Sequence, residues 1–96
     1  MGSRNAYEQK VQARLERIRA EIRRLQAKAR EADADTHIGM EEQAAQLDAR
    51  REAVLTRLAL LRDAGDETLA EVKAGLEAAL QDLEDAFEAA TAKFEK

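Results

Sequence analysis

The chain has 96 residues, of which 38% are charged, 45% are hydrophobic and 3% are aromatic, and its formal net charge is −4. It contains no cysteine, which excludes disulfides and thiolate metal sites, and no apolar run approaches the roughly 18 residues of a membrane span. Alanine supplies 21 of the hydrophobic residues, so few large side chains remain for a core. We therefore expect one cytoplasmic helical domain, residues 1–96, that shares its core with a partner chain.

Helix-forming residues dominate the chain, and proline, the strongest helix breaker, is absent. From Tyr7 to Leu61 an apolar or small residue recurs at nearly every step of about 3.6 positions, which is the period of a straight α-helix. Asn5 is a good N-cap, and Glu8 follows at capping-box spacing. The sequence therefore predicts an all-α protein whose first helix covers about residues 5–63.

A turn is predicted at residues 64–66, because Gly65 suits the left-handed position after a helix and Asp66 suits the next N-cap. A shorter antiparallel helix over about residues 67–95 would complete a helical hairpin. Gly75 lies inside this helix, where it predicts the close approach of another helix. The predicted hairpin core consists of Leu47, Val54, Leu58, Leu61, Leu69, Val72, Leu76, Leu80, Leu83, Phe87 and Phe94.

Residues 33–39 concentrate poor helix formers in the middle of the long helix, so two architectures are open. If the helix continues, its N-terminal apolar stripe has no cover within the chain, and we expect an antiparallel helical-bundle dimer. If the helix turns at 33–39, the alternative is a monomeric three-helix bundle. The oligomer interface predicted for the dimer consists of Tyr7, Val11, Leu15, Ile18, Ile22, Leu25, Ala29 and Ala32.

The charges are segregated along the chain. Residues 1–32 hold nine basic and four acidic side chains, whereas residues 66–96 hold three basic and nine acidic ones. Like charges also recur at i,i+4 within each segment, which disfavours each helix in isolation. This pattern predicts that the basic first third and the acidic final helix are neighbours in the folded assembly.

Few residues carry the chemistry of an active site. Asp33, His37 and Glu41 follow each other at i, i+4 and i+8, and they form a weak candidate metal site on one helical face. There is no cysteine, and His37 is the only histidine, so no nucleophile and base pair is recognisable. We expect no catalytic residues, no cofactor, no metal centre and no small-molecule substrate.

The function expected from these patterns is that of a non-enzymatic protein that acts by self-association and protein–protein interaction, as an antiparallel dimer. The basic residues 14–30 leave an alternative open, a peripheral module that binds anionic lipid or nucleic acid. The overall acidity and the lack of aromatic residues in that segment argue against it.

The final helix carries a recognisable pattern in residues 69–77, continued by Leu80, Leu83, Phe87, Ala90 and Phe94. With Arg4, Tyr7 and Lys10 near the start and residues 27–29 further on, it resembles a family of short bacterial coiled-coil stress-response proteins, of the light-stress-induced cyanobacterial type. The resemblance implies a cytoplasmic, stress-associated helical protein. It assigns no catalytic or ligand-binding residue.

Overall fold

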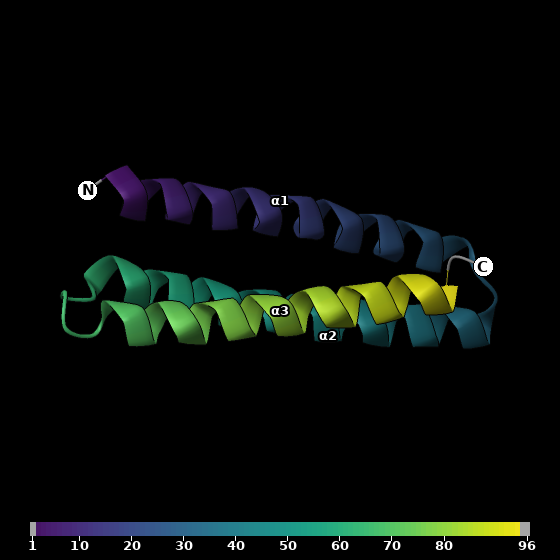
Figure 1. Cartoon of the computed structure of the whole chain (residues 1–96). Coiled ribbons are helices and arrows are strands. Elements are labelled where there is room, and N and C mark those ends of the chain that lie inside the picture. Colours follow the sequence, from purple (N-terminus) through teal and green to yellow (C-terminus); the bar gives the residue numbers. More distant parts are fainter. Residues whose placement is uncertain (1, 95–96) are drawn as a thin grey trace. The chain divides into compact units, whose positions relative to one another are not determined.

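The computed structural model of the chain describes residues 2–94. Within this range the chain forms three α-helices, α1 (Gly2–Glu31), α2 (Ala34–Asp63) and α3 (Leu69–Phe94), and no strand (Figure 1). The predicted all-α fold is confirmed. None of these helices is long and apolar enough to cross a lipid bilayer. The chain divides into two compact units, Met1–Ala44 and Ala45–Lys96, and each is described separately below.

The first unit contains the turn that decides between the two predicted architectures. The single helix predicted over residues 5–63 is wrong, because α1 ends at Glu31 and α2 begins at Ala34. The alternative turn at 33–39 is also placed wrongly, since residues 34–39 are already helical. Asp33 explains the difference: its carboxylate accepts a hydrogen bond from the Thr36 N–H at 2.9 Å, so it starts a new helix.

The turn between α2 and α3 also differs from the prediction. Gly65 does not have a positive φ, and the turn is closed by the Thr68 N–H, which donates to the Gly65 carbonyl at 3.1 Å. Thr68 then accepts the first helical bond of α3, from the Val72 N–H at 2.9 Å, so it occupies the N-cap position expected for Asp66. The helix starts two residues later than predicted, and its predicted last residue, 95, lies outside the described range.

In the second unit, the later part of α2 and α3 lie side by side and run antiparallel (Figure 1). The Arg50 guanidinium forms an ion pair with Asp82 at 3.2 Å, and the Arg57 guanidinium lies against Gly75. The contact that lies later in α2 thus involves the earlier residue of α3, as an antiparallel pair requires.

The predicted core residues of α2 and α3 differ in burial. Those that are at most 2% exposed are Leu47, Val54, Leu58, Leu61, Leu76, Leu80 and Leu83. Those that are only half-buried are Leu69, Val72, Phe87 and Phe94. The core of this unit is therefore built from leucine and valine, and its aromatic side chains remain partly in contact with solvent.

Truncating a core leucine should destabilise the protein strongly. We expect Leu80→Ala, at a side chain 1% exposed, to lower the free energy of unfolding by about 2–5 kcal/mol, because it removes buried surface and leaves a cavity. Leu60→Ala is the matched control, since Leu60 is 53% exposed, and its effect should stay within about 0.5 kcal/mol. Urea unfolding followed by circular dichroism measures both, and equal losses would contradict this assignment of the core.

Gly75 does not mark the close approach of a helix backbone. A Cβ at this position would meet only the guanidinium of Arg57, with Nη1 at 2.9 Å, which is the mobile end of a long side chain. Alanine is preferred over glycine within a helix by about 1 kcal/mol, so we expect Gly75→Ala to stabilise the protein by about 0.5–1 kcal/mol. The same substitution in an Arg57→Ala background should show the full gain in urea unfolding. A net loss of stability would mean that the Arg57 contact cannot adjust.

Candidate interaction surfaces

Two side chains organise the turn between α1 and α2. Asp33 caps α2, accepting the Thr36 N–H at 2.9 Å through its carboxylate and the His37 N–H at 2.8 Å through its backbone carbonyl. The ring nitrogen Nδ1 of His37 lies 2.7 Å from the carbonyl oxygen of Ala29, in the last turn of α1, and donates to it. The carbonyls at a helix end lack helical partners, so His37 caps α1 while Asp33 caps α2. We call these two side chains the double cap.

The double cap includes two of the three residues of the candidate metal site. Asp33 and His37 both make their hydrogen bonds within the turn, and Glu41 follows one helical turn later. Among the described residues no group of three or more histidine or acidic side chains is arranged to hold a metal ion. The structure therefore assigns Asp33 and His37 a structural part in the turn.

The Asp33 carboxyl has an altered acidity for the same reason. The hydrogen bonds from the backbone N–H and the side chain of Thr36 favour its ionised form and hold the pKa of Asp33 below its ordinary value of 3.8. The side chain is exposed to solvent. Its ionisation thus strengthens the cap without any burial of charge.

The residues predicted for an oligomer interface are mostly covered in a single copy of the chain. Buried ones, at most 5% exposed, are Val11, Leu15, Ile18, Ile22 and Ala29. Tyr7, Leu25 and Ala32 are half-buried. The stripe is therefore not an exposed apolar surface when α1 ends at Glu31.

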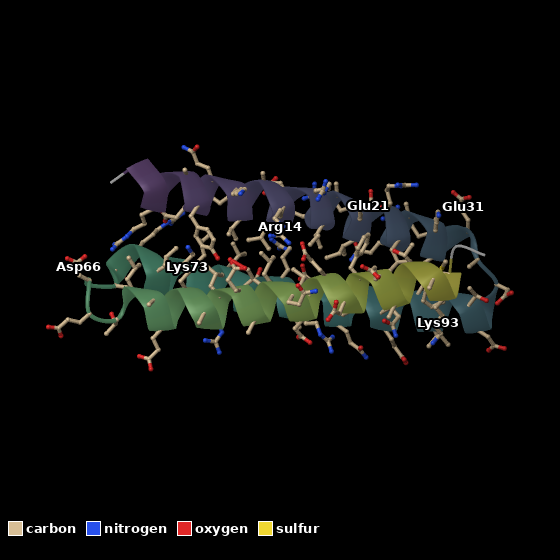
Figure 2. All side chains as sticks on the ribbon, in the orientation of Figure 1. Arg14, Glu21, Glu31, Asp66, Lys73 and Lys93 are labelled. Atoms are coloured by element: carbon tan, nitrogen blue, oxygen red, sulfur yellow. The ribbon has the colours of Figure 1, made fainter. Side chains whose placement is uncertain are left out.

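The opposite side of α1 carries exposed charge. Five of its basic side chains are exposed and make no hydrogen bond or ion pair with any described residue: Lys10, Arg17, Arg19, Arg23 and Arg30. We call these five residues the cationic face. By contrast, Arg24 is paired with Glu21 at 3.2 Å. Figure 2 shows nitrogen-tipped side chains along α1, with the labelled Glu21 and Glu31 among them.

The arginines of α2 are engaged differently. Arg51 falls in the apolar stripe of the sequence, and its side chain is only 14% exposed because it lies along the helix to reach Asp48 and Glu52, each at 3.3 Å. Arg50 is paired with Asp82 of α3. Unpaired basic charge is thus concentrated on α1.

Comparison with known proteins adds no relative: no protein family, no curated protein and no solved structure matches the chain significantly. The double cap and the cationic face therefore carry the functional interpretation by themselves.

The cap at Asp33 predicts a specific pH dependence. Because the pKa of Asp33 is lowered in the folded state, its contribution to stability is complete above pH 3.8 and is lost as the pH falls through the lower folded value. The difference in melting temperature between wild type and Asp33→Ala should therefore shrink below pH 3.8. The Asp33→Asn variant keeps a capping side chain that does not titrate. The difference in melting temperature between Asp33→Asn and Asp33→Ala should therefore be constant with pH. Thermal melts between about pH 6 and pH 2 test this prediction. A difference in melting temperature between wild type and Asp33→Ala that stays constant over this range would refute it.

Proposed function

We propose that this chain is a non-enzymatic helical interaction protein that associates with a second copy of itself by exchanging α1. In the closed chain the double cap holds the turn at residues 32 and 33. In the associated form α1 and α2 join into one helix, and two copies pair antiparallel. The observation that carries this proposal is that the sequence across the turn suits both conformations.

The turn contains nothing that prevents a continuous helix. It consists of Ala32, the best helix former, and Asp33, and no described residue has a positive φ or a cis peptide bond. The positions of the stripe continue in phase from Ala29 and Ala32 through Thr36 to Met40, as they would along one helix, and Thr36 is the polar one among them. The bend therefore depends on side-chain caps.

Straightening the turn costs little by itself, but the apolar side chains that it exposes must be covered, so we expect opening and association to occur together. The His37 bond to Ala29 is worth about 1 kcal/mol, and straightening the turn replaces lost cap bonds with helical ones. Val11, Leu15, Ile18 and Ile22 are buried in the closed chain, and a straight helix would remove α1 from the side chains that cover them there. Exposing these four large apolar side chains costs about 6–12 kcal/mol, so the open form requires a second copy to cover them.

The resemblance of the sequence to short coiled-coil stress-response proteins supports this proposal. Such a protein would act in the cytoplasm, and stress would change the balance between closed and associated chains. The segregated charge also supports it, because an antiparallel dimer would place the basic first third of one copy beside the acidic last helix of the other.

Removing the double cap should shift the protein towards dimers. We expect Asp33→Ala with His37→Ala to increase the dimer fraction at equal concentration, because both changes remove caps and both favour the continuous helix. Light scattering on a sizing column over about 10–300 µM protein measures this. Asp35→Ala is the matched control, since Asp35 lies two residues away in the first turn of α2 and makes neither cap bond.

A distance measurement separates helix exchange from other forms of association. Spin labels at Arg23→Cys and Glu42→Cys would be about 28 Å apart along a continuous helix and closer across the bend. The chain has no native cysteine, so labelling is specific. We expect the longer distance in the dimer fraction. Dimers that keep the short distance would overturn exchange, and a protein that stays monomeric in every variant would overturn self-association itself.

A further inference from the structure

We propose that the cationic face of α1 binds the phosphate backbone of duplex DNA. The proposal is independent of α1 exchange, because it uses the side of α1 opposite to the buried stripe. It rests on the arrangement of Lys10, Arg17, Arg19, Arg23 and Arg30 and on the absence of partners for them among the described residues.

The cationic face forms two rows. At about 100° of rotation per residue, Arg19, Arg23 and Arg30 fall along one side of α1, and Lys10 and Arg17 fall along the other. Between the rows lie exposed alanines at seven-residue spacing, which are Ala13, Ala20 and Ala27, together with the longer side chains of Glu16, Arg24 and Glu31. The exposed side of α1 therefore has small side chains at regular intervals along its middle and positive charge on both flanks.

The acidic residues of α1 do not cancel this charge. Glu16 and Glu31 are exposed on the same half of α1, beside five unpaired cations, so a net charge of +3 remains. Glu21 is already paired with Arg24. Exposed arginines without partners lose no internal interaction when they bind an anion, and guanidinium groups bind phosphate oxygens in a bidentate manner.

The shape of this surface fits the major groove of B-form DNA. The groove is about 12 Å wide and admits one α-helix, and the alanines between the rows let the helix approach closely at those positions. The two rows would then face the phosphates of the two strands, which positions a helix without reading the base sequence. The deep, narrow major groove of duplex RNA does not admit a helix in this way.

Other anionic partners fit less well. Single-stranded nucleic acid is bound by stacking on aromatic side chains, and the only aromatic residue of α1 is the half-buried Tyr7. A membrane-surface helix inserts large apolar side chains beside its cations, whereas the exposed apolar residues between the rows of α1 are alanines. The exposed large apolar residues of the described chain, Ile38 and Leu60, both belong to α2.

The test is fluorescence anisotropy of a labelled duplex of mixed sequence, titrated with the whole chain between about 50 and 200 mM salt. If the net excess of three cations contacts phosphate, the logarithm of the binding constant should fall with the logarithm of salt with a slope of about −3. The triple variant Arg19→Gln, Arg23→Gln and Arg30→Gln should bind at least about tenfold more weakly at low salt and reduce the slope by about 2–3.

A matched variant on α2 controls for net charge. Arg50→Gln, Arg57→Gln and Arg62→Gln remove the same three charges from another helix, and this variant should bind within about threefold of wild type. The proposal is overturned if the α2 variant loses as much affinity as the α1 variant, or if wild type shows no binding at about 50 mM salt and 100 µM protein. Equal or tighter binding to vesicles of anionic lipid would also overturn it, in favour of a membrane partner. Circular dichroism confirms that each variant is folded.

Discussion

A helix end leaves backbone groups without helical partners, and the way in which Asp33 and His37 satisfy them determines the course of the chain. Asp33 accepts an N–H at the start of α2, and His37 donates to a carbonyl at the end of α1. Two side chains thus satisfy the end of α1 at Glu31 and the start of α2 at Ala34. Helix propensity and apolar period alone favour one helix, so the fold depends on a local and replaceable interaction.

The helices and their buried faces follow from the sequence because the apolar period extends over many turns. The helix ends are harder to predict, because each depends on a single hydrogen bond. Asp33 has the residue type of an N-cap. Its spacing to His37 and Glu41, however, is also that of a metal-binding face on a continuous helix, so the sequence alone does not select the cap. At the second turn Asp66 is as good a cap as Thr68 by residue type, and the bond to the Val72 N–H selects Thr68. The five unpaired cations could not be predicted, since pairing depends on side-chain placement.

The buried stripe and the cationic face of α1 contribute to binding through different physical interactions. The buried stripe contributes through the area that it removes from water, so either its own chain or a second copy can cover it. The cationic face contributes through unpaired charge, so it stays in water until an anion replaces solvent and counterions. High salt should therefore weaken contacts of the cationic face and leave burial of the stripe nearly unchanged.

Burial of the stripe in a dimer and anion binding by the cationic face use different residues of α1, and only a cation of that face that pairs with the acidic last helix of the second copy would be shared between the two. An exchanged dimer would carry two copies of α1 at a fixed separation, and the second copy would then bind DNA at the effective concentration set by the first. A modest affinity of one cationic face would rise sharply on dimerisation without a new contact. The double cap at Asp33 and His37 would thus control DNA affinity from a turn outside the cationic face, by setting how many copies of α1 the assembly holds.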